Sequence, residues 1–520
     1  MGVNTHIDIS EKDLNNLHEL LKRYLPNTKI WAFGSRVKWT SRPDSDLDLV
    51  VFTTKEQNRQ VHNLKDALQE SSLPFRVDVL VWDNIPDTFR ENIKQQYFVL
   101  VDLNTNRSCG MSSEWQEMTL GEFAPFVYGK SLPEKNRIAG EFPVASSAGI
   151  IGTHTTPLVK TGGIIVGRKG TVGSVTLCKT PFWVIDTAFY IPDTPDKDLL
   201  FTYYLFQTLG LSGMNSDSAV PGLNRDNAHA VPVLIPPLKE QQQIARYLSI
   251  LDDRITLLRE TNATLEAIAQ ALFKSWFVDF DPVHAKAQGR QPEGMDEQTA
   301  ALFPDRFVES ELGMVPLGWE VVELVEISEI LNGYAFKSED YIEDENGVFV
   351  LRTTNFSDDG YAKRLGKDVF LPMSFTDTHS KYLCEPFDFH LVMVGASVGK
   401  TSTLLPNMLP ALRNQNMWCF RPKNGFPSRF FIHETVKLKT VEALRSTSGS
   451  AREFLRKGDF EKSSVKLPTN DILAVFEDTT LAIKQTIAIN ESQAQTLVDL
   501  RDTLLPRLIS GQLRLPDVEA

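Results

Sequence analysis

The sequence predicts a multidomain α+β protein, in which an N-terminal α/β domain precedes two further α/β domains separated by two long helices that form an antiparallel coiled coil. The chain of 520 residues is too long for one hydrophobic core, so about three or four domains are expected. Most of the chain is an internal repeat, and each repeat ends in a long helical segment. The expected segments are 1–110, 113–237, 238–280 (first long helix), 281–317 (linker), 318–468 and 469–520 (second long helix and tail).

Composition and charge are typical of a cytoplasmic globular protein. The chain is 42% hydrophobic and 23% charged, and no apolar run is long enough to span a bilayer, so we expect no membrane partner. Cys109, Cys178, Cys384 and Cys419 lack metal-ligand spacing and are expected to be reduced thiols. The net charge of -13 counts against nucleic-acid binding, unless a local basic groove or a basic partner subunit supplies the phosphate contacts.

The N-terminal segment predicts one helix and three strands. Residues 9–25 (ISEKDLNNLHELLKRYL) place leucines on one helical stripe. Residues 29–36 (KIWAFGSR) read as a strand that ends in a Gly-Ser turn. Residues 45–52 (SDLDLVVF) and 75–82 (FRVDVLVW) are two further strands.

Carboxylates of these strands predict a metal site. Asp46 and Asp48 project from the same face because strand side chains alternate, and Asp78 joins them if its strand pairs alongside. Three converging carboxylates suit Mg²⁺, which could bridge triphosphate oxygens and activate an attacking hydroxyl. Gly34 and Ser35 would bring a backbone N–H and a hydroxyl against the phosphates. A DxD pair alone is usually the solvated face of a strand, so the expectation depends on the whole set.

The order GS, then DxD, then Asp resembles the polymerase-beta-like minimal nucleotidyltransferase superfamily, over roughly the first hundred residues. The resemblance implies a Mg²⁺-dependent nucleotidyl-transfer fold that uses a nucleoside triphosphate. It also implies that the three aspartates are catalytic metal ligands and that Gly34, Ser35 and Arg36 bind the nucleotide. One departure stands at Trp39, where small prokaryotic members usually have Gly, and an indole there could crowd the nucleotide.

The remainder of the chain predicts a two-fold repeat. Each half opens with a Trp and a short strand, continues through a strand, Gly turn and strand, and ends in a long helix. The paired segments are 114–132 with 318–336, 162–177 with 389–405, and 223–248 with 454–476.

The two long helices carry a coiled-coil pattern. Their apolar positions alternate in steps of three and four, and Asn262 lies on the first seam, where a polar residue fixes the register. Each helix of nearly forty residues would be roughly 55 Å long. A globular segment separates them, so they can pair antiparallel. The seam residues are Ile244, Leu248, Leu251, Ile255, Leu258, Leu265, Leu272 and Trp276, then Ile483, Ile487, Asn490, Ala494, Leu497, Leu500 and Leu504.

This order of domains and helices resembles the specificity subunit of type I restriction–modification systems, over about residues 113–515. The segments that carry the resemblance are 233–255 (VLIPPLKEQQQIARYLSILDDRI), 272–289 (LFKSWFVDFDPVHAKAQG), 309–324 (ESELGMVPLGWEVVEL) and 500–515 (LRDTLLPRLISGQLRL).

The resemblance implies two target-recognition domains, each reading one half of a split double-stranded DNA site, with the helices setting the gap between the halves. It also implies two methyltransferase subunits, which carry S-adenosylmethionine and dock on the helices, and a motor-nuclease subunit that joins for restriction.

Three of the DNA-contact candidates, Arg168, Lys169 and Lys400, lie on Gly turns that are expected to correspond in the two halves. GASVGKTS is read as such a turn, because three residues separate Gly395 from Gly399 where a P-loop requires four. The alternative for each candidate is an ordinary solvated surface residue. The candidates are Arg168, Lys169, Asn224, Arg225 and Asn227 in the first half, and Lys400, Arg452, Arg456 and Lys457 in the second.

Two functional hypotheses remain open. In the first, the chain is a non-catalytic DNA-recognition subunit, and its nucleotidyltransferase-like domain is an accessory. In the second, that domain transfers a nucleotide to a protein or RNA, and the specificity-like domains target it. We favour the first, because the specificity resemblance covers most of the chain and because we find no complete methyltransferase or motor motif.

Overall fold

The computed structural model describes residues 7–9, 11–26, 28–37, 45–53, 57–71, 73–86, 89–90, 93–94, 97–101, 115–214, 222–447 and 454–515. The chain divides into two compact units, which are Met1–Ala245 with Pro506–Ala520, and Arg246–Leu505. The helices in the described ranges are either too short or too polar to cross a membrane.

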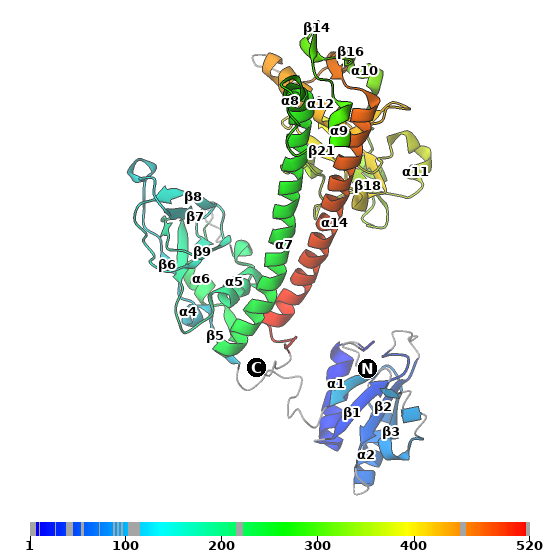
Figure 1. The fold of residues 1–520 in the computed structure, drawn as a ribbon. Coiled ribbons are helices and arrows are strands. Elements are labelled where there is room, and N and C mark those ends of the chain that lie inside the picture. Colours follow the sequence, from blue (N-terminus) through cyan, green and yellow to red (C-terminus); the bar gives the residue numbers. More distant parts are fainter. Residues whose placement is uncertain are drawn as a thin grey trace. The chain divides into compact units, whose positions relative to one another are not determined.

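The N-terminal domain is a four-stranded sheet with helices α1 and α2 packed on one face (Figure 1). The strand order is β3-β2-β1-β4, with β2 and β3 parallel and the other neighbours antiparallel. The predicted helix and three strands are confirmed, whereas α2 and β4 were not predicted. The elements are α1 Glu11–Tyr24, β1 Lys29–Phe33, β2 Leu47–Phe52, α2 Asn58–Gln69, β3 Val77–Val81 and β4 Phe98–Val101.

The opposite face of this sheet carries an aromatic cluster. Trp31 stacks on Tyr97 with ring centroids 3.8 Å apart, and Phe52 stacks on Trp82 at 4.6 Å. Along β2, Asp48 alternates onto the same face as Phe52, away from the leucines and valines that face α1 and α2. The carboxylate and the aromatic side chains therefore share one face of the sheet.

The first repeat, residues 115–235, contains a four-stranded sheet of order β10-β9-β12-β6, a three-stranded sheet β11-β7-β8 and the antiparallel pair β13-β5. Its elements are β5 Gln116–Thr119, α4 Leu120–Phe123, β6 Val127–Tyr128, β7 Phe142–Ser146, β8 Gly149–His154, β9 Gly163–Gly167, β10 Val175–Cys178, β11 Trp183–Val184, β12 Ala188–Pro192, α5 Leu199–Thr208, α6 Arg225–His229 and β13 Pro232–Ile235.

The second repeat, residues 319–467, contains sheets of order β17-β23-β20-β21 and β19-β18-β22 and the antiparallel pair β16-β24. Its elements are β16 Glu320–Glu323, α10 Leu324–Ile327, β17 Ser328–Asn332, β18 Val348–Leu351, β19 Phe370–Leu371, β20 Phe389–Val392, β21 Thr401–Thr403, β22 Ala411–Arg413, β23 Met417–Pro422, α12 Arg429–Thr447, α13 Lys457–Glu461 and β24 Ser464–Leu467.

The two repeats share one topology, which confirms the predicted duplication. Each four-stranded sheet joins its strands in the same order, and each three-stranded sheet has a parallel pair, β7 with β11 and β18 with β22. The Gly turns that were expected to correspond also occupy equivalent places, between β9 and β10 and between β20 and β21. Gly173 and Gly399 have φ of +71° and +84° there, a left-handed conformation that favours glycine.

Each repeat is followed by a long helix, α7 (Leu238–Phe273) or α14 (Asn470–Ile509), and within the second unit these run side by side (Figure 1). The pairing is antiparallel, because Asp252 of α7 meets Arg501 of α14 whereas Asn262 meets Asn490. The Asn490 amide donates to Asn262 Oδ1 at 2.9 Å, and the Asn262 amide donates to the Ile487 carbonyl at 3.3 Å. The predicted polar residue on the seam is therefore confirmed, and its partner is the seam asparagine of the second helix.

The expected linker, residues 281–317, contains regular structure. It comprises two short helices and a hairpin, α8 Asp281–Ala287, α9 Glu297–Leu302, β14 Phe307–Ser310 and β15 Gly313–Pro316.

The Trp that opens each repeat packs against the end of a long helix. Trp319 contacts Phe277 and Phe280, just beyond α7, with ring centroids 6.0 and 5.5 Å away. In the first unit, the Trp115 ring lies 5.2 Å from the Arg514 guanidinium, just beyond α14. The segment just after α14 thus contacts the start of the first repeat, as the segment just after α7 contacts the start of the second.

Candidate functional sites

The Gly-Ser turn after β1 lies directly against a carboxylate. Gly34 has φ of +85°, and a Cβ atom built on it would lie 2.1 Å from Asp48 Oδ2. Asp48 pairs in register with Phe33, the last residue of β1. Glycine is therefore required at this position for two reasons. The backbone is left-handed, and the carboxylate occupies the space that a side chain would need. Ser35 follows in the same turn and is half-buried.

The three predicted carboxylates gather at one end of the aromatic face. Asp78 is the in-register neighbour of Asp48 across the parallel β2–β3 pair, and Asp46 precedes β2 and is exposed. Burial, followed by the charges of Asp78 and Asp46, raises the pKa of Asp48 above its ordinary value. Arg76 lies 3.4 Å from Asp78. These carboxylates repel one another. A hard divalent cation would neutralise their negative charges and could take their oxygen atoms as ligands.

These aspartates are less tightly gathered than a formed metal site. Across the described ranges, the one group of three potential ligands whose atoms all lie within 4.8 Å is Cys384, Asp388 and His390. The metal role of Asp46, Asp48 and Asp78 therefore stays a prediction.

Arg36 makes contacts within the domain that the sequence did not reveal. Its guanidinium is buried and donates to the Ser45 carbonyl at 2.7 and 3.0 Å and to the Asp8 carbonyl at 3.0 Å. It also lies 4.3 Å from the centre of the Phe75 ring. These contacts tie the Gly-Ser turn to the segment that precedes β2, so Arg36 supports the carboxylates, and its contact with a nucleotide stays a prediction. Trp39 and Arg452 lie outside the described residues.

Two of the five DNA-contact candidates in the first repeat converge on one aromatic ring. The guanidinium of Arg168, after β9, lies 5.0 Å from the centre of the Tyr128 ring, and that of Arg225, in α6, lies 5.2 Å from it. Tyr128 is 46% exposed, and sequence reasoning missed it because it sits on a two-residue strand. Lys169 is exposed beside this cluster.

Asn224 has a local structural role. Its side chain caps α6 by accepting hydrogen bonds from the backbone N–H groups of Asp226 and Asn227 at 2.8 and 3.1 Å. Asn227 itself is exposed.

In the second repeat, each of the three candidates that the structure describes has a neighbouring partner. Lys400, at the end of the Gly turn, pairs with Asp358 at 2.8 Å, and Lys457 pairs with Glu461 at 3.6 Å within α13. The Arg456 guanidinium lies 5.6 Å from the ring of Phe454. Arg456 and Lys457 begin α13 as Asn224 and Arg225 begin α6, so the predicted correspondence of these positions is confirmed by the topology.

A buried ionic cluster joins the second repeat to both long helices, and sequence reasoning did not find it. Glu266 of α7 accepts hydrogen bonds from Lys484 of α14, from the Tyr361 hydroxyl at 2.6 Å and from Lys437 of α12 at 3.4 Å. Lys437 also pairs with Glu434 at 2.6 Å. Burial disfavours the Glu266 carboxylate, but the two lysines outweigh it and lower its pKa to about 2. We call these five residues the Glu266 cluster.

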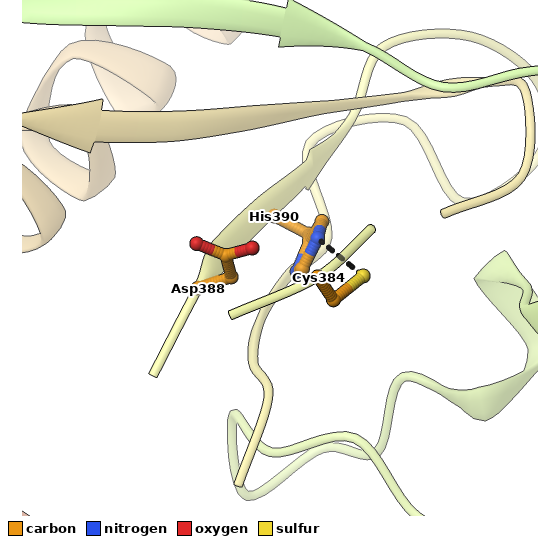
Figure 2. Close-up of side chains that lie close together, drawn as sticks. All are labelled: Cys384, Asp388 and His390. Carbon is orange, nitrogen blue, oxygen red and sulfur yellow. Dashed lines mark hydrogen bonds between the residues drawn. The ribbon is translucent and has the colours of Figure 1, made fainter. Parts of the chain in front are cut away.

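Cys384, Asp388 and His390 lie close together in the core of the second repeat (Figure 2). Both Asp388 oxygens accept hydrogen bonds from Arg421, at 2.6 and 2.8 Å. Burial lowers the pKa of His390 to about 4 and raises that of Cys384. The thiol and imidazole are therefore neutral and the carboxylate is already paired with a cation, so this group is structural.

The chain contains two duplicated α/β domains, and each is followed by one long helix of an antiparallel pair. This arrangement defines a modular recognition protein. A further α/β domain, which carries the three aspartates, precedes them. The type I restriction modification DNA specificity domain matches residues 112–267 and 316–490, and the chain belongs to this family. Polymerase beta, Nucleotidyltransferase matches residues 15–106, so the N-terminal domain is a nucleotidyltransferase domain, whose substrate class is a nucleoside triphosphate. The resemblances stated from the sequence are thereby confirmed.

Known proteins resemble the two parts separately. The type I restriction enzyme HindI specificity subunit of Haemophilus influenzae is 27% identical over 393 residues, covering 64% of this chain and 81% of that protein. The probable protein adenylyltransferase MntA of the same organism is 38% identical over 95 residues, covering 18% of this chain and 83% of that protein. The crystal structure of the type I restriction-modification S subunit from M. genitalium aligns with a TM-score of 0.50 at 16% identity, covering 81% of this chain and 99% of that one. This likeness confirms the predicted fold class.

Proposed function

We propose that the chain is the DNA specificity subunit of a type I restriction–modification system and that it reads a bipartite double-stranded site. Each repeat would contact one half of the site, and the antiparallel helices would set the gap between the halves. The observation that carries this proposal is the duplicated topology, with each copy followed by one helix of the pair. The Asn262–Asn490 contact supports a fixed helix register, which a fixed gap requires.

The proposed DNA contacts are basic and polar groups on the equivalent turns and short helices of both repeats, together with Arg452, which lies outside the described residues. They would make local contacts that the acidic chain as a whole does not favour. The proposed set is Arg168, Lys169, Asn224, Arg225 and Asn227, with Lys400, Arg452, Arg456 and Lys457.

The proposed protein partners are two methyltransferase subunits, which would bind S-adenosylmethionine, and a motor-nuclease subunit for restriction. Large apolar side chains on α7 outside its seam support docking on the helices. Tyr247, Ile250 and Leu257 are 44%, 57% and 51% exposed, whereas seam residues such as Ile255 and Leu258 are buried. Exposed apolar side chains at helical spacing are what a partner subunit would cover. The complex would act in the cytoplasm.

Substitution of this outer face is expected to weaken methyltransferase binding. Ile250→Glu with Leu257→Glu would place two charges in the interface, and a central interface residue typically contributes more than about 1 kcal/mol, so affinity should fall at least roughly tenfold. The double variant should unfold at the same temperature as the wild type, because neither side chain is in the core. Co-purification and titration with the methyltransferase measure the effect, and Lys239→Glu at the exposed start of α7 is the control. Unchanged affinity would place the docking surface elsewhere.

The function is tested by mapping methylated adenine genome-wide in cells that express the methyltransferase with or without this chain. We expect one bipartite motif, two short halves around a fixed gap, that depends on the chain. If no motif depends on it while the methyltransferase is present and active, the DNA-specificity proposal is wrong.

A second function is proposed for the N-terminal domain, which would transfer a nucleotide from a triphosphate to a protein or RNA. Asp46, Asp48 and Asp78 would hold Mg²⁺, and the metal would neutralise triphosphate charge when bound. The Gly34–Ser35 turn would face the phosphates. This proposal rests on the contact of Gly34 with Asp48 and on the pairing of Asp48 with Asp78.

A further inference from the structure

One aromatic ring of the N-terminal domain is open to solvent. Phe89 is 40% exposed, which makes it the most exposed of the aromatic residues that the structure describes in this domain. Other rings on the same face of the sheet are covered by stacking, Trp31 on Tyr97 and Phe52 on Trp82. A single exposed apolar side chain is ordinary on a protein surface, so the meaning of Phe89 depends on what lies beside it.

Phe89 lies beside the Gly-Ser turn and the aspartates. Its ring is perpendicular to that of Phe33, with the two ring centroids 5.9 Å apart. Phe33 directly precedes Gly34 and is the cross-strand partner of Asp48, so the Cβ atoms of Phe33 and Asp48 lie on one face about 5 Å apart. The ring of Phe89 is therefore on the order of 10 Å from the Asp48 carboxylate.

The contact with Phe33 leaves part of the Phe89 ring available to a ligand. In an edge-to-face pair each ring is contacted on one side only, so Phe33 leaves at least one face of Phe89 uncovered. Phe33 itself is 8% exposed and packs in the buried aromatic cluster of this face. The outer ring thus has a fixed support on one side and solvent on the other.

A nucleotide presents a flat base that is separated from its phosphates by one sugar. Bases stack on aromatic side chains, and this contact tolerates any base because every base has a π-face. If the phosphates lie at Gly34 and Ser35, the base must lie within one sugar of that turn. Phe89 is separated from the turn by the single side chain of Phe33, so its ring is within reach of such a base.

We propose that Phe89 is the base-binding residue of the N-terminal domain and that the base of the nucleoside triphosphate stacks on its exposed ring. Phe33 would hold this ring beside the phosphate-binding turn. The inference rests on the proposed nucleotide-transfer function, and it adds the residue by which the domain would distinguish a nucleotide from a bare polyphosphate.

The test compares two ligands that share the phosphates and differ in the base. Calorimetry with Mg²⁺ measures binding of ATP and of inorganic tripolyphosphate to the purified full chain. Phe89→Ala should weaken ATP binding roughly five- to a hundredfold, as loss of one base–aromatic contact does, and leave tripolyphosphate binding unchanged. Phe89→Trp keeps a stacking ring and should recover ATP binding. Leu80→Ala removes a side chain of similar exposure, 39%, and should bind both ligands as the wild type does.

Other outcomes overturn the inference. Equal weakening of both ligands by Phe89→Ala would show that the ring supports the phosphate site and does not bind the base. Unchanged ATP binding in Phe89→Ala would show that the base lies elsewhere. Either result leaves the proposed nucleotide-transfer function in place. If the wild-type chain binds neither ligand in the presence of Mg²⁺, that function is itself wrong, and this inference with it.

Discussion

Replacement of Glu266 by Ala is expected to lower the free energy of unfolding by about 3–5 kcal/mol, because it leaves the buried Lys484 cation without its paired anion. The Lys484 side chain is 4% exposed and that of Lys437 27%, and both contact the Glu266 carboxylate. The hydroxyl of Tyr361, which donates to Glu266 and accepts from Lys484 at 3.0 Å, would lose its acceptor. Denaturant unfolding of the full chain measures the change.

An apolar replacement of the charges is the informative control. Glu266→Leu combined with Lys484→Met removes both charges of the buried pair at similar volume and leaves Lys437 paired with Glu434. Buried ion pairs replaced in this way often lose no stability. We expect the double variant to recover most of the stability that Glu266→Ala loses. If the double variant is as unstable as the single one, side-chain packing and not the uncompensated charge explains the loss.

The same cluster predicts how this stability changes with pH. The pKa of Glu266 falls from an ordinary 4.5 to about 2, so the folded state favours the ionised carboxylate. At about 1.4 kcal/mol per pKa unit, its contribution is about 3 kcal/mol. That contribution is complete above about pH 4.5 and is lost as the pH falls through about 2. The difference in unfolding free energy between wild type and Glu266→Gln should therefore be large at pH 7 and shrink below pH 4.

The contrast between Asn262 and Glu266 shows how far the sequence could predict the fold. Asn262 interrupts a regular apolar seam, so its position on the helix interface follows from the heptad spacing alone. Glu266 reads as an ordinary charged residue of a helix. Its partners are Tyr361, in the segment between β18 and β19, Lys437 of α12 and Lys484 of α14, so local periodicity cannot reveal them.

The candidate sites show the same division. Strand alternation predicted that Asp46 and Asp48 lie on one face. The sequence placed Asp78 with them only if its strand pairs beside that of Asp48, and β3 does pair with β2 in that register. The motif alone gave Arg36 a nucleotide-binding role, because nothing in the sequence indicates that its guanidinium is buried against the Ser45 and Asp8 carbonyls. Tyr128 was missed for a similar reason, since its two arginine neighbours are distant along the chain.

Replacement of Asp48 by Asn is expected to reduce nucleotide transfer by the N-terminal domain at least roughly a hundredfold. Mutation of a residue that only orients a metal ligand typically lowers metal affinity or activity about 10- to 100-fold, and Asp48 would itself be a ligand. Gly34→Ala should have an effect of similar size, because its Cβ would lie 2.1 Å from Asp48 Oδ2 and displace the carboxylate. Incorporation of label from α-labelled ATP with Mg²⁺, using the purified complex, measures both. Asp83→Asn, an exposed carboxylate in the same domain, is the matched control and should keep full activity.

Asp48→Asn and Gly34→Ala should impair nucleotide transfer without changing DNA recognition. Residues 15–106 lie outside the segments that match the specificity family, so Asp48→Asn and Gly34→Ala should leave the methylation motif unaltered. Burial and like charge already raise the pKa of Asp48, so the neutral Asn relieves repulsion, and Asp48→Asn should not unfold the domain. Label incorporation that is equal in wild type and Asp48→Asn would contradict the assignment of the carboxylates. Loss of the methylation motif in the same variant would instead show that the nucleotidyltransferase domain takes part in DNA recognition.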